Sequence, residues 1–194
     1  MKERPIIMGA ESVRAILEGR KTQTRRVIKP QPKFIGAPNV PFKTDDANPK
    51  GIINCPYGNV GDRLWVRETV FFETFHQQSD EELERDGFNP NIGVWVYRAD
   101  NHDYPTITAN WTSPMFMPRE ASRITLQITD IRVERVQDIT EEDAIAEGVE
   151  SFNTVASYSY LWDSLNAKRG YPWENNPWVW VISFKRVHNQ KEDV

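Results

Sequence analysis

The sequence predicts an α+β domain built around a mixed or antiparallel β-barrel with two or three short helices. Several short segments alternate apolar and polar residues and are rich in β-branched and aromatic side chains, which is typical of strands. The helical patterns are short and show no regular βαβ alternation, which argues against a parallel α/β fold. With 194 residues and 39% hydrophobic residues, we expect residues 1–194 to form a single domain around one core.

The clearest strand pattern alternates over fifteen residues, from Ser122 to Val136. It predicts that Ile124, Leu126 and Ile128 face the core. Weaker patterns predict strands at 22–28, 63–70, 93–98 and 178–185. Helices are expected at 11–18, at 141–147 after a capping Thr140, and at 157–166.

Two segments are expected to lack regular structure. Residues 30–60 form a long Pro-rich insertion, with six prolines from Pro30 to Pro56, and such a length is unusual for a simple connection. Residues 186–194 are expected to form a polar tail. The acidic segment 77–85 is predicted to be exposed.

Composition narrows the class of protein. Cys55 is the single cysteine, so one chain cannot build a disulfide framework, and a reducing cytoplasm fits. No stretch has the roughly 18 consecutive apolar residues of a membrane span, and no export signal is visible. We therefore expect a cytoplasmic protein without a membrane partner.

The charge of the chain is unevenly distributed. The net charge is −4, yet residues 1–50 carry 11 Lys and Arg against 5 Asp and Glu. An anionic or electron-rich ligand would therefore bind to this basic part of the chain.

The sequence lacks the residues that several large enzyme classes require. His76, His102 and His188 are scattered, and no paired-histidine or paired-cysteine motif provides zinc ligands. No phosphate-binding glycine loop, dinucleotide-binding turn or nucleophile elbow is present. We expect neither a metal nor a cofactor.

The segment Gly19-Arg20-Lys21-Thr22-Gln23-Thr24-Arg25-Arg26 gathers an amine, hydroxyls and guanidinium groups where a helix is expected to give way to a strand. Like-charged neighbours and burial both lower the pKa of a lysine. A neutral Lys21 amine could then take the proton of the Thr24 hydroxyl and make it a nucleophile. A solvated basic corner is the alternative interpretation.

The pattern Gly19-x-Lys21-x-x-Thr24-x-Arg26 after a short amphipathic helix resembles the signature of the ASCH domain family, which implies a PUA-like β-barrel. Many members have Glu where this chain has Thr24. The Thr form resembles the small ASCH amidohydrolases that cleave N4-acetylcytidine, so the resemblance implies catalytic roles for Lys21 and Thr24. Their third residue would fall on Glu147, for which a surface glutamate is the alternative.

The whole chain looks more like the longer phage and prophage ASCH proteins, whose function is less settled. An acid at the end of a helix, such as Glu147, opposes the helix dipole, which indicates that another group holds it there. Trp65 and Arg67 share one face of a predicted strand and Glu68 lies on the other. Together with Arg26 these three are candidate substrate-binding residues, although a tryptophan in such a position is more often part of the core than a binding platform.

The predicted function is a metal-independent amidohydrolase that removes acyl groups from N4-acylated cytosine nucleosides or bases. Its partner would be that small modified nucleoside or base. The alternatives are a PUA-like RNA-binding module and a ribonuclease without amidase activity, with RNA as the partner. RNA binding through the basic N-terminal quarter would be sensitive to salt.

Overall fold

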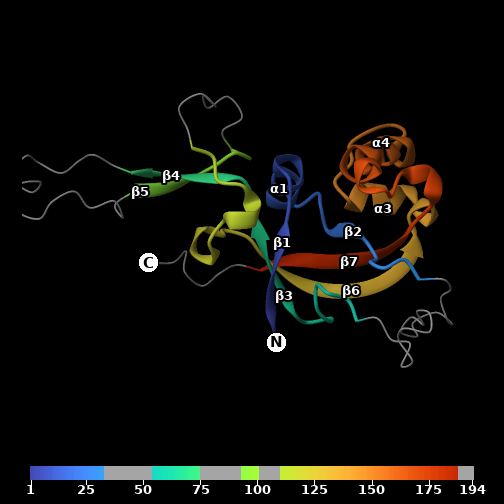
Figure 1. Cartoon of the computed structure of the whole chain (residues 1–194), viewed down its shortest axis with the longest axis horizontal. Helices are drawn as coiled ribbons and strands as arrows, with labels where there is room; N and C mark the ends of the chain where they lie inside the picture. Colours follow the sequence, from blue (N-terminus) through green and yellow to red (C-terminus); the bar gives the residue numbers. More distant parts are fainter. Residues whose placement is uncertain (33–53, 75–92, 101–109, 188–194) are drawn as a thin grey trace, which may run out of the picture.

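The main sheet has five strands and is mixed. The computed structural model describes residues 1–32, 54–74, 93–100 and 110–187. The strands are β1 (Glu3–Ile7), β2 (Gln23–Val27), β3 (Arg63–Arg67), β6 (Thr125–Arg135) and β7 (Trp178–Val187). Their order is β1-β3-β6-β7-β2 (Figure 1). Strand β1 runs parallel to β3, and all other neighbours are antiparallel.

The sheet is open in the part of the chain that the structure describes, whereas the sequence led us to expect a closed barrel. The ladder ends at β1 on one side and at β2 on the other. A side chain links these two edges, because Nη2 of Arg26 donates a hydrogen bond to the carbonyl oxygen of Ile7 at 2.6 Å. The edges therefore meet through a guanidinium group and not through a backbone ladder.

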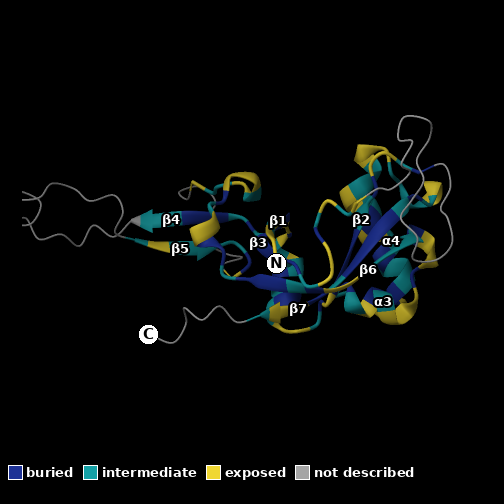
Figure 2. Ribbon diagram, turned by 90° about the horizontal axis from the view of Figure 1, so that it is seen from below, coloured by how far each residue is buried: buried dark blue, intermediate teal, exposed yellow. Residues whose placement is uncertain are grey.

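A β-bulge divides β6 into two halves. Leu126 and Ile128 face the main core in the first half, as predicted. The register shifts between Ile128 and Asp130, and beyond the shift Ile131 and Val133 pack against the same core. Because of this one extra residue, even-numbered residues face the main core before the bulge and odd-numbered residues face it after the bulge. The short helix α1 (Ala10–Leu17) covers this core with Val13 and Ile16, and Figure 2 shows buried residues along the strands of the main sheet.

A second core lies on the opposite face of the sheet, beneath α3 (Glu141–Ala146) and α4 (Thr154–Asn166). Helix α3 begins as predicted, because Oγ1 of Thr140 accepts a hydrogen bond from the backbone N–H of Asp143 at 3.1 Å. The second core consists of Val136, Ile139, Ala144, Tyr158, Trp162, Val179 and Val181.

A two-stranded arm projects from the other end of the molecule (Figure 1). Strands β4 (Val70–Thr74) and β5 (Gly93–Tyr97) pair antiparallel, and Phe72 of one packs against Trp95 of the other. A polar clamp holds its base: the buried Glu68 receives two hydrogen bonds of 3.0 Å from Arg123, whose guanidinium also binds Asp100. The same guanidinium lies 3.9 Å from the ring centre of Tyr97.

Most elements lie within a few residues of their predicted positions. The sequence pattern did not predict β1 or β4, and β7 extends to Val187, two residues into the expected polar tail. Most of the 30–60 insertion, the acidic segment 77–85 and residues 188–194 lie outside the described residues.

Short 3₁₀ helices complete the described part of the chain, at Pro114–Phe116, Arg119–Ala121, Val136–Asp138, Ala167–Arg169 and Trp173–Asn175. Within the described ranges, no helix combines the length and apolar character that crossing a bilayer requires.

The clamp at the base of the arm should contribute to stability. Glu68 is 2% exposed, and removing its charge takes from Arg123 the more buried of its two carboxylate partners. We expect Glu68→Gln to lower the free energy of unfolding by about 3 kcal/mol, measured by urea denaturation. Asp100→Asn removes the more exposed partner of the same guanidinium and should cost less than about 1 kcal/mol. Equal losses in the two variants would contradict this account.

Candidate active site

The corner between α1 and β2 is held by backbone hydrogen bonds. After α1 the chain turns at Gly19, whose φ is +77°, a conformation that side chains other than hydrogen disfavour. The N–H groups of Arg20 and Lys21 both donate to the carbonyl oxygen of Ala15 at 2.9 Å. The N–H of Thr22 donates to Ala146 at the end of α3 at 2.8 Å. The end of α3 therefore lies directly beside Lys21.

Lys21 and Glu147 form a buried ion pair at this corner. Nζ of Lys21 lies 2.6 Å from Oε2 of Glu147 and also donates to the backbone oxygen of Glu147 at 2.7 Å. The two residues are 5% and 6% exposed. Glu147 is the C-cap residue of α3, where a negative charge opposes the helix dipole. The Lys21 ammonium offsets that penalty, so neither group is the solvated surface charge of the alternative interpretations.

Gly148 allows this close approach. Its φ is +88°, and a Cβ placed there would lie 3.0 Å from Cβ of Ala15 and 3.3 Å from Cβ of Lys21. A residue with a side chain would be strained by the backbone angle and would also press on α1 and on Lys21.

The sheet register places two arginines beside this pair. Arg25 of β2 and Arg132 of β6 both lie opposite Val181 of β7, one on each side, so the three side chains share one face. Asp143, one turn before Glu147 on α3, binds Arg25 at 2.6 Å and Arg132 at 2.8 Å. Glu134 binds both arginines as well.

Three positive and three negative groups, joined by contacts of 3.5 Å or less, thus form one charge network. Its members are Lys21, Arg25, Arg132, Glu134, Asp143 and Glu147. Burial lowers the pKa of Lys21, and the opposing effect of Glu147 is too small to restore it. Burial would raise the pKa of Asp143, but the hydrogen bonds from Arg132 and Arg25 outweigh it and lower that pKa. Burial raises the pKa of Tyr158, and the charge of Glu147 adds to the effect.

Thr24 and Arg26 lie on the other face of β2. They pair with Ile182 and Trp180, which belong to the main core, whereas Arg25 pairs with Val181 of the second core. Thr24 is 4% exposed. The hydrogen bonds of the Lys21 ammonium go to Glu147 and not to the Thr24 hydroxyl.

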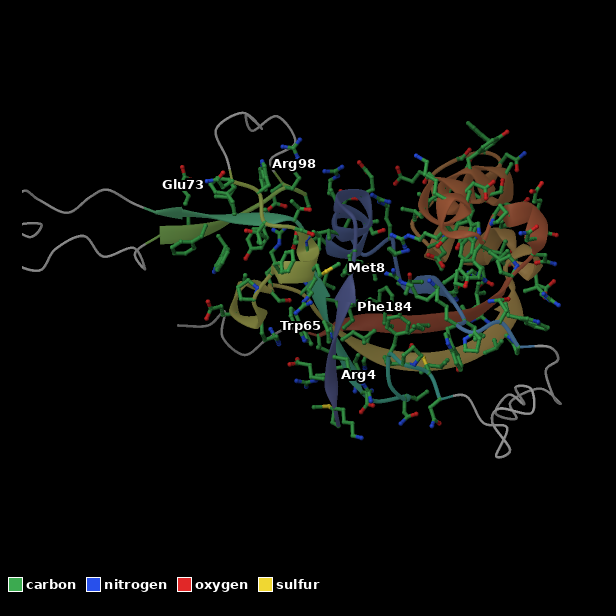
Figure 3. The ribbon with its side chains drawn as sticks, viewed as in Figure 1. Arg4, Met8, Trp65, Glu73, Arg98 and Phe184 are labelled. Atoms are coloured by element: carbon green, nitrogen blue, oxygen red, sulfur yellow. The ribbon has the colours of Figure 1, made fainter. Side chains whose placement is uncertain are left out.

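Trp65, Arg67 and Glu68 are not brought to this corner. Trp65 is 8% exposed, and the guanidinium of Arg67 lies 4.6 Å from its ring centre. Arg67 also donates to the carbonyl oxygen of Met115. Figure 3 shows Trp65 at the end of the sheet near the arm, away from α3 and α4. The carboxylate of Glu68 is occupied by Arg123. These contacts hold the three side chains at the arm and involve none of the proposed catalytic residues.

The sequence analysis missed the members of the charge network beyond Lys21 and Glu147. A signal for some of them is present: Asp143 and Glu147 are four residues apart and share a helix face, and Arg132 and Glu134 alternate along a strand. Their connection to Arg25 depends on the pairing of β6, β7 and β2, which local patterns do not reveal. In the residues described, no group of three or more His, Cys, Asp or Glu is arranged to hold a metal ion.

Comparisons with known proteins show similarity in backbone arrangement. The structure is similar to an ASCH domain from Lactobacillus crispatus JV V101, with 11% identity, 97% of this chain and 81% of that chain covered, and a TM-score of 0.44. It is also similar to a DUF984 family protein from Enterococcus faecalis V583, with 9% identity, 96% and 76% covered, and a TM-score of 0.43. No protein-family model matches the sequence, and the search of curated proteins found no significant match.

The Lys21–Glu147 pair should be strongly coupled. Lys21→Met leaves a buried carboxylate without its partner, so we expect the free energy of unfolding to fall by about 3–5 kcal/mol. Adding Glu147→Gln removes the unpaired charge and should recover part of that loss. A double-mutant cycle by urea denaturation measures the coupling, and additive losses would show that the two groups act independently.

Substituting Gly148 should cost more than substituting a glycine of similar φ in open space. Gly170 has a φ of +87°, and no atom lies within 4 Å of the position that a Cβ would take there. Gly170→Ala therefore reports the backbone strain alone, about 1–2 kcal/mol. Gly148→Ala adds the contacts with Ala15 and Lys21 and should be less stable than Gly170→Ala. Thermal or urea unfolding of the two variants compares them, and equal losses would exclude the contact.

Proposed function

We propose that this protein is a metal-independent amidohydrolase that removes acyl groups from N4-acylated cytosine nucleosides or bases. The observation that carries the proposal is the buried pair of Lys21 and Glu147, 2.6 Å apart, with Lys21 three residues before Thr24 and its hydroxyl. The pattern Gly19-x-Lys21-x-x-Thr24-x-Arg26 supports the substrate class through its resemblance to the ASCH amidohydrolases.

The pair provides a route to an uncharged amine. An ammonium group removed from water is costly to maintain unless its partners fully compensate it. Burial already lowers the pKa of Lys21. A neutral Lys21 amine can accept a proton, which a lysine with its usual pKa of about 10.4 cannot do near neutral pH.

In the proposed reaction Oγ1 of Thr24 attacks the acyl carbonyl carbon and its proton passes to Nζ of Lys21. Lys21 then protonates the departing N4 of cytosine, which leaves an acyl ester on Thr24. Water attacks this ester and returns the proton through Lys21 to Thr24, which releases the carboxylic acid. Glu147 orients Lys21 throughout. The hydrogen bond from Thr24 to Lys21 is expected to form in the substrate complex, because catalytic hydrogen bonds often tighten only when substrate binds.

Arg26 would hold a carbonyl oxygen of the ligand. One of its nitrogens, Nη2, is bound to Ile7. Its Nε is buried and has no hydrogen-bond partner among the described residues. A ligand oxygen would satisfy this donor, since buried polar groups without a partner are costly.

Turnover of N4-acetylcytidine tests the proposal. With EDTA present, the wild type should release cytidine, and Thr24→Val and Lys21→Met should each be slower by about 10²–10⁴-fold, the usual contribution of positioned proton transfer. Release is followed by liquid chromatography. The exposed residues Thr22 and Lys185 provide matched controls, because Thr22→Val and Lys185→Met should retain wild-type rates.

Failure of the wild type to hydrolyse a series of N4-acyl groups would refute the proposed activity. Salt-dependent retention of RNA in that case would support a binding module instead.

A further inference from the structure

Arg25 is the most buried member of the charge network. Its side chain is 0% exposed, against 31% for Arg132. Nη1 donates to Oε1 of Gln23 at 2.6 Å, and Nη2 binds Asp143 at 2.6 Å and Glu134 at 3.1 Å. This guanidinium is therefore fixed in position by three acceptors from β2, β6 and α3.

The two oxygens of the Glu147 carboxylate have different neighbours. Oε2 accepts the hydrogen bond from Lys21. Oε1 is buried and forms an ion pair with Nη1 of Arg25 at 3.5 Å, and the Tyr158 side chain also interacts with the Glu147 carboxylate. Arg25 thus attracts one oxygen of the carboxylate while Lys21 binds the other, which limits rotation of the Glu147 side chain.

We propose that Arg25 is a positioning residue that holds Glu147 with Oε2 toward Lys21 and that its fixed positive charge helps to set the pH range in which the Lys21 amine is uncharged. The catalytic half of this inference rests on the proposed amidohydrolase function. The half that concerns the protonation of Lys21 does not.

The charge effect follows from the groups that face Lys21. Glu147 at the end of α3 favours the ammonium form, whereas Arg26 and Arg25 of β2 disfavour it, and burial is the largest influence on the pKa. Tyr158 of α4 is neutral near physiological pH, because burial raises its pKa. Guanidinium groups carry a fixed positive charge in proteins, so the effect of Arg25 on Lys21 is constant.

Arg132 is a matched control for Arg25. It is a member of the same network and binds the same two carboxylates, Glu134 and Asp143. Its ion-pair partners among the described residues are these two and Asp130, so it contacts neither member of the Lys21–Glu147 pair in this way. Removal of Arg132 therefore takes one positive charge from the network and leaves the pair's own contacts in place.

The first test is an NMR titration of Lys21, with lysine labelled with ¹³C and ¹⁵N in the full chain and the signal assigned from Lys21→Arg. We expect Arg25→Gln to raise the titration midpoint of Lys21 by about one pH unit. Arg25→Lys, which keeps the charge, and Arg132→Gln should leave the midpoint near that of the wild type. An unchanged midpoint in Arg25→Gln, or an equal shift in Arg132→Gln, would overturn the inference.

The second test separates geometry from charge. A lysine cannot reproduce the planar fork of Arg25, so Arg25→Lys should lower kcat on N4-acetylcytidine by about tenfold to a hundredfold with little change in KM. A wild-type kcat in Arg25→Lys would refute the positioning role. If Arg25→Gln does not fold, a crystal structure of Arg25→Lys decides: a Glu147 carboxylate that has not moved relative to Lys21 overturns the inference.

A wild type that does not hydrolyse N4-acetylcytidine would refute the proposed function alone. The titration of Lys21 would still confirm or overturn the role of Arg25.

Discussion

The corner between the first helix and the second strand depends on one interaction, the contact between the ammonium of Lys21 and the carboxylate of Glu147 away from water. Removing two charges from solvent costs more than their attraction returns unless further polar groups support them. The surrounding structure provides that support: the end of α3 contributes a backbone oxygen, and two strands and the first turn of α3 contribute the remaining charges. The Lys21–Glu147 pair therefore restricts how α1, β2 and α3 can pack, in addition to its proposed chemical role.

Strand β2 contributes side chains to both faces of the sheet. Its residues alternate between the main core, where Thr24 and Arg26 lie, and the charge network, where Arg25 lies. The proposed reaction therefore requires the Thr24 hydroxyl and the Lys21 amine to meet at the start of this edge strand. Lys21 precedes the strand, and its backbone is held by α1 and not by the ladder.

Local patterns were sufficient to predict most helices, most strands and the corner at Lys21. Gly19 ends a short amphipathic helix, and the unfavourable place of Glu147 in the helix dipole indicated a hidden partner. Strand β1 was missed because it is five residues long, contains Pro5 and pairs with a strand about sixty residues away. Arg25 lies more than a hundred residues from Glu134 and Asp143, so no window of the sequence contains the network.

The extra residue in β6 has a consequence for how this corner tolerates change. Before the bulge, even-numbered residues of the strand face the main core, and after it the odd-numbered residues do. If the strand kept all its residues but paired without the bulge, Arg132 and Glu134 would turn into the apolar core, while Ile131 and Val133 would point toward α3. A one-residue deletion at the bulge would instead leave both faces as they are, so the placement of apolar residues along this strand fits the folded protein only because the bulge lies between its two halves.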